Sequence, residues 1–421
     1  MSRSPSAPDR PLRVFLIAGE SSGDVLGGRL ISALRARAHG GVEVAGIGGP
    51  CMAAEGLESL FPYSELAVMG LAEVIPRARS LFRRMKETAR EIDRFRPDIL
   101  VTIDAPAFVF GVVRRLKSRD AARVHYVAPQ VWAWRPWRVR KFRRRFDHLM
   151  ALFPFEPPYF TRAGLGCTFV GHPVVECGAD RGDGGAFRER YEIAEDAPVL
   201  CLLPGSRRGE VSRLLEPFGE TAHRMARRLE GLRVVVPTVA HAADIIRART
   251  ADWSVPVVVV EGHEEGYGAM AASNVALAAS GTVSLELAMA GVPCVTAHRV
   301  WPPTAWILRR MIRIPYVNSV NLLAGHEAIP ELLQEKCRPD KLEAELMALL
   351  LTPERRRNIL EAQNSALRQL GLGGRPPSER AADVVFRFAT EHRAADSALN
   401  ETRVGLSTLR EPAAGRGRPA P

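Results

Sequence analysis

A carboxylate stands at the end of one of the most apolar runs in the chain. Asp104 closes the segment ILVTID and is followed by Ala105 and Pro106. Burial at a strand end raises the pKa of a carboxyl group, which suits a general base. The alternative is a structural carboxylate that accepts backbone N–H bonds from the following turn. Asp104 is therefore the candidate catalytic residue.

Two short turns in the second half of the chain have the composition of an anion cradle. Each lies between an apolar run and a helical pattern, and together they contain Gly205, Ser206, Arg207, Ser280, Gly281 and Thr282. Glycine lets the backbone approach a diphosphate, hydroxyl groups donate hydrogen bonds to it, and arginine neutralises its charge. Glu286, about one helical turn later, can accept hydrogen bonds from both hydroxyl groups of a ribose. These residues fit a nucleotide diphosphate, and the alternative for the first turn is a capped helix with solvated arginines.

Two similar turns in the first half predict a cleft. AGESSGD at residues 18–24 and GIGGPCM at residues 46–52 each follow a strand-like run. Turns of this kind bind ligands in doubly wound folds, because the next helix offers free N–H groups at the carboxyl end of the strand. The dinucleotide fingerprint G-x-G-x-x-G is absent. A tight turn with Asp24 near the helix N-terminus is the alternative for the first of these segments.

Several chemistries are excluded by what the sequence lacks. None of the five lysines lies in a G-x-x-x-x-G-K-[ST] run, the six cysteines are scattered without a C-x-x-C pair, and no Asp-x-Asp occurs. These absences exclude a P-loop nucleoside triphosphatase and predict a reduced, cytosolic chain without a metal site or a cofactor. Arginine and helix N-termini would then stabilise any leaving-group charge.

Alternating elements predict an α/β fold with two doubly wound, Rossmann-like halves. Short β-branched runs alternate with longer helical patterns, which is typical of βαβ units. The expected strands are 12–18, 42–47, 99–103, 124–127, 148–152, 168–170, 199–203, 233–236, 257–260, 275–278 and 294–297. The expected divisions are a disordered N-terminus (1–11), a first domain (12–175), a Gly- and Asp-rich linker (176–195), a second domain (196–370), a C-terminal helix (371–392) and a disordered tail (393–421).

Positive charge is concentrated in two stretches. The net charge is +11, while residues 135–145 carry seven bases and no acid, and residues 77–96 carry eight bases against three acids. Such patches favour phosphate-bearing partners, whether nucleic acid, anionic lipid or a phosphorylated substrate. Aromatic residues of the segment 126–134 precede the first stretch and can stack on nucleic acid. Their clustering beside prolines favours a packed wall of a cleft.

An amphipathic stretch at residues 66–86 carries an apolar stripe bordered by arginines. At 100° per residue its apolar side chains fall within an arc of about 120°. This pattern is typical of a helix at a membrane interface, and also of a helix that faces a core. The N-terminus lacks a signal-peptide apolar stretch, and charged, glycine and proline residues interrupt the segment 273–297. We therefore expect contact with a membrane from one side only.

Several short motifs follow one another between about residues 12 and 385. In chain order they are AGESSGD, GIGGPCM, IDAP, APQVWAW, LFPFE, FVGHP, LLPGSRRGEV, ASGTVSLE and YVNSVNLLAG. In this order they closely resemble the lipid-A-disaccharide synthase family. The resemblance implies a GT-B glycosyltransferase, in which two Rossmann-like domains face a central cleft. The implied donor is UDP-2,3-diacylglucosamine and the implied acceptor is 2,3-diacylglucosamine 1-phosphate. They would be joined by an inverting reaction with release of UDP and no cofactor.

Residue roles follow from the resemblance as expectations. Asp104 would be the base for the acceptor hydroxyl, and Asn321 of the NLLAG segment would join the seven UDP-binding residues named above. The implied acceptor-binding residues are Glu20, Ser22, Gly23, Asp24 and Met69. The implied membrane-contacting residues are Leu66, Val68, Leu71, Val74, Ile75, Leu81 and Phe82.

Assembly and location are implied in the same way. The resemblance to the family implies a homodimer in which the two chains exchange their carboxyl-terminal segments. Asn321 would then serve the partner's site. The expected location is the cytoplasmic face of the inner membrane, on an anionic lipid surface. One position departs from the family, since IDAPDF is replaced here by IDAPAF with Ala107. Competing interpretations are a UDP-sugar 2-epimerase or other soluble nucleotide-sugar enzyme, and a nucleic-acid-binding protein.

Overall fold

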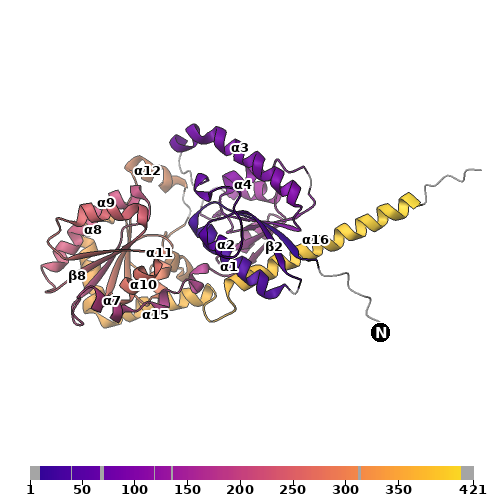
Figure 1. Cartoon of the computed structure of the whole chain (residues 1–421). Coiled ribbons are helices and arrows are strands. Elements are labelled where there is room, and N and C mark those ends of the chain that lie inside the picture. Colours follow the sequence, from indigo (N-terminus) through magenta and orange to yellow (C-terminus); the bar gives the residue numbers. More distant parts are fainter. Residues whose placement is uncertain are drawn as a thin grey trace, which may run out of the picture. The chain divides into compact units, whose positions relative to one another are not determined.

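The computed structural model describes residues 10–38, 40–66, 71–117, 119–133, 136–311 and 314–408. The chain divides into two compact units (Figure 1). Unit 1 comprises Met1–Pro129, Trp137–Val170 and Ser378–Pro421, and unit 2 comprises Gln130–Pro136 and Gly171–Pro377. Each unit contains one sheet of six parallel strands.

The sheet of unit 1 has the strand order β2-β1-β3-β4-β5-β6. Its strands are β1 Leu12–Ala18, β2 Val42–Ile47, β3 Ile99–Ile103, β4 Ala122–Tyr126, β5 His148–Ala151 and β6 Gly166–Phe169. The central strands β3, β4 and β5 are buried at every residue, because helices cover both faces of a parallel sheet. The covering helices are α1 Ser21–Arg37, α2 Pro50–Ala54, α3 Leu71–Phe95, α4 Pro106–Val113, α5 Val139–Arg143, α6 Pro157–Thr161 and α16 Pro377–Thr408.

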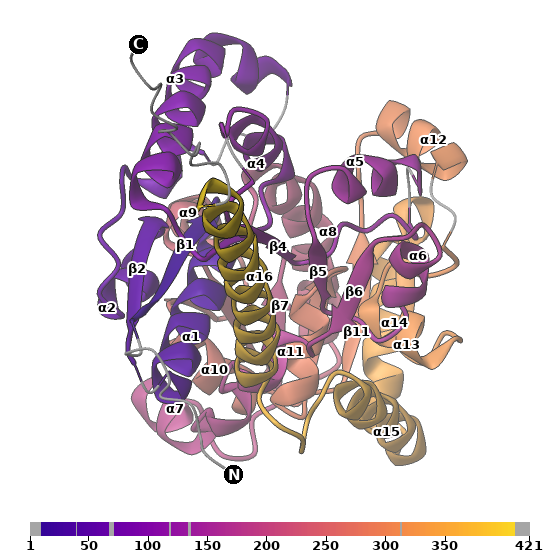
Figure 2. The same cartoon turned by 90° about the vertical axis from the view of Figure 1, so that its right-hand side faces the viewer.

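The last helix, α16, packs on the sheet of unit 1. Ala381, Val385 and Ala389 are fully buried in the same apolar cluster as Leu30 of α1. Figure 2 shows α16 beside α1, and Arg37 of α1 pairs with Asp383 of α16. The side chain of Asp98, before β3, accepts hydrogen bonds from Arg393 and Arg10.

Both ends of the chain are ordered further than the sequence pattern predicts. Residues 393–408 continue α16, although we expected a disordered tail from residue 393. Arg10 is held by Asp98, and the carbonyl of Pro11 accepts a bond from Arg393, although both fall in the expected disordered N-terminus. Residues 1–9 and 409–421 lie outside the described residues.

The sheet of unit 2 has the order β12-β11-β10-β7-β8-β9. Its strands are β7 Val199–Leu203, β8 Arg233–Thr238, β9 Val257–Glu261, β10 Val275–Ala279, β11 Cys294–His298 and β12 Glu331–Leu333. Its helices are α7 Gly184–Arg190, α8 Arg208–Ala226, α9 Ala240–Thr250, α10 His263–Ala271, α11 Val283–Met289, α12 Pro302–Met311, α13 Ser319–Ala324, α14 Pro339–Leu351 and α15 Pro353–Gln369.

The segment predicted as a linker, residues 176–195, belongs to unit 2 instead of joining the units. It contains α7, and a Cβ on Gly182 or Gly184 would lie within 2.6 Å of backbone atoms of α10. Arg188 of α7 also donates to the carbonyl of Ala272 over 2.7 Å. The glycines that gave this segment the composition of a linker are needed for close packing of two helices.

All eleven expected strands are present, within one or two residues at their ends. The twelfth, β12, escaped prediction because it has three residues and begins with a glutamate. Among the described residues, no helix is long and apolar enough to cross a membrane. The same part of the chain holds no group of three or more His, Cys, Asp and Glu side chains arranged to bind a metal ion.

Candidate active site

Each sheet has one point where the strand order changes direction. In unit 1 this point lies between β1 and β3, and in unit 2 it lies between β7 and β10. Doubly wound folds bind their ligands outside the carboxyl ends of the strands at such a point. The turns after β1 and β3, and those after β7 and β10, contain most of the residues predicted from the sequence.

Asp104 follows β3 in a strained backbone conformation. Asp104 and Ala105 have φ values of +50° and +47°, and Val127, just after the neighbouring strand β4, has a φ of +72°. Non-glycine residues in this left-handed region cost about 1–3 kcal/mol each and gather at functional sites. A β-branched valine there is a true outlier. Strain at the ends of two adjacent strands marks this edge of the sheet as a site.

The carboxyl group of Asp104 has the electrostatic character expected of a base. Burial raises its pKa, while the backbone N–H of Ala105 and the positive charge of Arg138 act in the opposite direction. A raised pKa makes the carboxylate a better proton acceptor. Sequence reasoning placed Arg138 only in a basic stretch, and its proximity to Asp104 depends on the fold.

The turn after β1 is in direct contact with the turn that carries Asp104. A Cβ on Gly19 would lie 2.4 Å from the Cβ of Ala105, so only glycine fits here. Glu20 is half-buried at the N-terminus of α1 and Ser22 is exposed, whereas Gly23 is buried against the strands. Of the predicted acceptor-binding side chains, the structure therefore brings Glu20 and Ser22 to the edge that holds Asp104. Gly19, whose role the sequence motif alone does not reveal, sets the spacing of the two turns.

Asp24 is turned into the protein. Only 2% of it is exposed, and its carboxylate accepts N–H bonds from Gly49, Cys51 and Met52 over 2.7, 2.9 and 3.0 Å. Both oxygens are engaged, so Asp24 caps α2 and joins it to α1. This placement matches the structural alternative considered for the AGESSGD segment.

The first turn of unit 2 holds two exposed polar side chains. Gly205 has a φ of +104°, and a Cβ there would lie 2.7 Å from Oε2 of Glu210. Ser206 and Arg207 after it are exposed, and the carbonyl of Ser206 lies 2.7 Å from Nε2 of His241. The glycine therefore lets the chain turn sharply from β7 into α8 and leaves Ser206 and Arg207 accessible.

The second turn of unit 2 lies at the end of the adjacent strand, β10. Nothing lies within 4 Å of the position of a Cβ on Gly281, and Thr282 is exposed. The hydroxyl of Ser280, in contrast, donates to Oε1 of the buried Glu331 over 2.7 Å. Because β7 and β10 are neighbours, both turns face the same edge of the sheet. Glu331 was missed in the sequence because it belongs to the short strand β12.

Glu286 has the most perturbed carboxyl group in this region. Burial raises its pKa to about 7. Within the described residues its carboxylate forms no hydrogen bond or ion pair. A half-buried carboxylate without a protein partner is ready to accept hydrogen bonds from a ligand.

Asn321 is engaged inside unit 2. It is fully buried, and its side-chain oxygen accepts N–H bonds from Ala328 and Ile329 over 3.0 and 2.8 Å. Its amide nitrogen donates to the carbonyl of Ile329 over 2.9 Å. These three bonds close the loop between α13 and β12, so the structure does not bring Asn321 to the surface where the other predicted donor residues lie.

Five of the seven predicted membrane residues belong to α3, and Leu66 precedes this helix. Met69, assigned to the acceptor, and Val68 lie outside the described residues, as do the side chains of Leu71, Val74 and Ile75. Leu66 and Leu81 are half-buried, and Phe82 is 52% exposed. Phe82 is thus the one predicted membrane residue whose described side chain is largely open to solvent.

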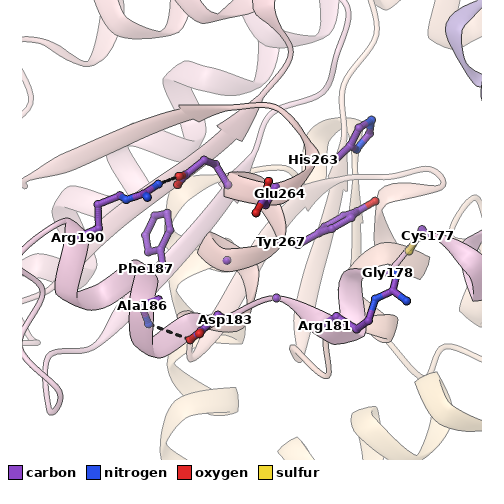
Figure 3. A pocket seen from close by; sticks show the side chains of 13 residues that line it. Cys177, Gly178, Arg181, Asp183, Ala186, Phe187, Arg190, His263, Glu264 and Tyr267 are labelled. Carbon is purple, nitrogen blue, oxygen red and sulfur yellow. Dashed lines mark hydrogen bonds and ion pairs between the residues drawn. The ribbon is translucent and has the colours of Figure 1, made fainter. Parts of the chain in front are cut away.

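A separate pocket of about 440 Å³ lies between the segment around α7 and the helix α10 (Figure 3). Its lining includes Arg181 and Tyr267 and none of the predicted site residues. Two of its charged side chains that could bind a ligand are engaged within the protein: Arg190 pairs with Glu265, and Asp183 accepts the backbone N–H of Ala186 over 2.9 Å. We assign this pocket no role in catalysis.

The fold is shared with solved structures of low sequence identity. UDP-GlcNAc 2-epimerase from Neisseria meningitidis matches with a TM-score of 0.61 at 12% identity, covering 89% of this chain and 100% of that one. MurG from Acinetobacter baumannii matches with a TM-score of 0.52 at 16% identity, covering 90% and 100%. The predicted class, α/β with two Rossmann-like domains of the GT-B type, is therefore confirmed.

The sequence narrows this class to one family. A family model described as Lipid-A-disaccharide synthetase matches residues 14–382. The lipid-A-disaccharide synthase of Rhodospirillum centenum is 51% identical over 389 residues, which are 92% of this chain and 97% of that protein. That of Paramagnetospirillum magneticum is 50% identical over 379 residues, or 89% and 97%. The chain belongs to the lipid-A-disaccharide synthase family.

Proposed function

We propose that this protein transfers 2,3-diacylglucosamine from UDP to the 6-hydroxyl of 2,3-diacylglucosamine 1-phosphate, forming the β-1,6-linked lipid A disaccharide 1-phosphate and UDP. Membership of the family at about half identity over nearly the whole chain is the observation that carries this proposal. The UDP-sugar epimerases, in contrast, share only the fold at 12% identity.

Asp104 is the general base in this proposal. The acceptor oxygen attacks C1 of the donor sugar, the bond from C1 to the phosphate oxygen of UDP breaks, and the hydroxyl proton passes to Asp104. A single displacement of this kind inverts the anomeric centre and needs one base held close to the hydroxyl. The raised pKa of Asp104 and its position at the change of strand order support the assignment.

The donor is held by unit 2. Arg207 and the accessible backbone at Gly281 receive the diphosphate, Ser206 and Thr282 donate hydroxyl bonds, and Glu286 accepts the ribose hydroxyl groups. Arg207 and backbone N–H groups then supply the charge that stabilises UDP as it leaves, without requiring a metal ion. Gly205 and Ser280 shape the two turns.

The acceptor is received by unit 1. Glu20 and Ser22 lie at the edge that holds Asp104, and their polar side chains can hold the sugar. Gly23 and Asp24 act indirectly, because they fix the first turn of α1 and its contact with α2. Met69 keeps the role implied by the family resemblance.

The enzyme works on the cytoplasmic face of the inner membrane in this proposal. Exposed Phe82 lies on α3 among the exposed cations Arg79, Arg83 and Lys86, which is the arrangement of a helix that rests on anionic lipid. The test is sedimentation with vesicles that contain anionic or only zwitterionic lipid. Equal binding to anionic and to zwitterionic vesicles would contradict the proposal.

The family resemblance also supports a homodimer with exchanged carboxyl-terminal segments. Figure 1 shows the end of α16 extending beyond the rest of unit 1, where it is available to a second chain. Light scattering after size exclusion should give twice the mass of 46.2 kDa. A monomer at micromolar concentration would contradict this part of the proposal.

The activity is tested by measuring UDP release in non-ionic detergent with the diacylated donor, with and without the acceptor 1-phosphate, and with EDTA. We expect release that depends on the acceptor, survives EDTA and yields the disaccharide. Turnover of plain UDP-N-acetylglucosamine, with none of the acylated donor, would instead assign a soluble-sugar enzyme.

A further inference from the structure

A basic cavity, separate from the pocket between α7 and α10, lies at the amino ends of β4 and β5, whereas Asp104 lies at the carboxyl end of β3. It has a volume of about 390 Å³. Its walls come from the end of α4, the connection from α4 to β4, the beginning of β4 and the connection from α5 to β5. The lining residues are Val113, Arg114, Leu116, Lys117, Arg119, Arg123, Arg144 and Arg145.

Six of these eight residues are cations and none is an acid. Arg114, Lys117, Arg119 and Arg144 are exposed, so their charges are directed at solvent and at whatever enters the cavity. The side chains of Arg114, Lys117 and Arg144 form no hydrogen bond or ion pair within the described part of the chain. A cavity with only positive charge attracts and concentrates anions.

The inner part of the cavity is preorganised. Arg119 donates to the carbonyl of Arg144 over 2.7 Å, and Arg145 lies over the ring of Phe110, 5.0 Å from its centroid. Arg123 is 6% exposed, and burial together with the positive charge of Arg119 lowers its pKa. Asp147, Asp120 and Asp93 act on Arg123 in the opposite direction and do not line the cavity.

We propose that this cavity, the α4–α5 cavity, binds a phosphate group. Arginine presents a planar fork of N–H donors that matches phosphate oxygens, and three or four cations around one cavity can neutralise a doubly charged phosphate monoester. The cavity lies at the amino ends of the strands and Asp104 lies at their carboxyl ends, so the length of the sheet separates the cavity from the proposed site of reaction.

Its surroundings favour the headgroup of an anionic lipid as the source of the phosphate. α4 packs against α3, where a Cβ on Gly111 would meet the side chain of Met85, and Arg115 lies over the ring of Phe82. Phe82 belongs to the surface of α3 proposed to rest on the membrane. The assignment of the phosphate to a lipid headgroup rests on the proposed function. The proposal that the cavity binds a phosphate group does not rest on it.

The experiment uses the full chain and two probes. One probe is glycerol 3-phosphate, followed by titration calorimetry, and the other is phosphatidylcholine vesicles with or without phosphatidic acid, followed by sedimentation at physiological salt. The pocket variant is Arg114→Gln/Lys117→Gln/Arg144→Gln. The matched control is Arg227→Gln/Arg357→Gln/Arg368→Gln, which removes the same charge from exposed positions of unit 2.

The pocket variant should bind phosphatidic acid vesicles about 10- to 100-fold more weakly than the parent, since each cation near an anionic surface contributes measurably. Its binding of glycerol 3-phosphate should be lost, while the control stays within about threefold for both probes. Lost glycerol 3-phosphate binding with unchanged vesicle binding would assign the site to a free phosphate compound. Equal behaviour of the two variants would overturn the proposal.

UDP release in detergent separates this result from the proposed function. Neither triple variant touches the proposed catalytic residues, so both should keep the parent rate, and their circular dichroism should match the parent. A parent protein without activity would refute the proposed function and leave the phosphate measurement valid.

Discussion

The carboxylate at residue 104 can be separated experimentally from its neighbours. Asp104→Asn keeps the shape of the side chain and removes the base, so kcat should fall by about 10²- to 10⁴-fold with a small change in KM. The measurement is UDP release with both acylated substrates. A variant with near-parental kcat would make Asp104 a structural residue.

Ala107 provides a control for this assignment. It is exposed in the first turn of α4, at the position where the sequence departs from the IDAPDF pattern. If Asp104 is the base, Ala107→Asp should change kcat by less than about threefold, and the double variant Asp104→Asn/Ala107→Asp should stay as slow as Asp104→Asn. Rescue by the second substitution would move the role of base to position 107.

Glu286 predicts a pH dependence of donor binding. Its pKa of about 7 means that about a tenth of the carboxyl groups are ionised at pH 6 and about nine tenths at pH 8. UDP-N-acetylglucosamine, whose phosphates do not titrate in this range, should therefore bind about tenfold more tightly at pH 8. Glu286→Gln should remove this dependence. An equal dependence in both proteins would show that another group titrates.

At the scale of elements, Asn321 is expected to stabilise a loop instead of binding UDP. Asn321→Ala would leave the N–H and the carbonyl of the buried Ile329 without these partners, while the N–H of Ala328 keeps its bond to the carbonyl of His326. Each such group costs about 1–3 kcal/mol. The urea midpoint should drop clearly, while the Kd for UDP of the folded fraction stays within about threefold. A normal midpoint with lost UDP binding would restore the predicted donor contact.

The sequence predicts the helices and strands better than it predicts where individual side chains point. β-Branched runs identify eleven strands, and the order of the elements places Asp104, Gly205 and Ser280 at strand ends. The sequence does not reveal that Asp24 and Asn321 point inward, because this depends on residues 25 and 8 positions away. The same limit hid Arg138 and Glu331, which are brought to the site only by tertiary packing. Glycine content misled at residues 176–195, where it serves close packing.

For the whole molecule, acid should weaken folding. Burial lowers the pKa of His125 to about 3, and those of His148 and His172 to about 4. These folded-state values lie below the unfolded value of about 6.5, so the unfolded chain binds more protons and stability is lost as the pH falls below 6.5. The raised pKa of Glu286 acts in the opposite direction, because this carboxyl group binds its proton more tightly in the folded chain. It offsets the effect of one of the three histidines on stability.

The net difference of about two protons corresponds to roughly 3 kcal/mol per pH unit between pH 6 and 5. Urea midpoints should therefore fall steeply across that range and change little between pH 7 and 8. Replacing His148 by Gln, which can still bond Thr168, should reduce the slope by about one proton. A midpoint that does not change with pH would show that these histidines are accessible to protons in the folded state.

The position of α16 has a consequence for biosynthesis. Unit 1 contributes the first strands to leave the ribosome, yet its core stays open on one face until residues 378–408 arrive, more than 200 residues after Val170. At about 5–20 residues per second this is a wait of roughly 10–40 s, during which the apolar face that will receive Ala381, Val385 and Ala389 is uncovered. The earliest part of the chain to be translated is thus the last to finish folding, and nascent chains that stall before residue 378 become clients for chaperones.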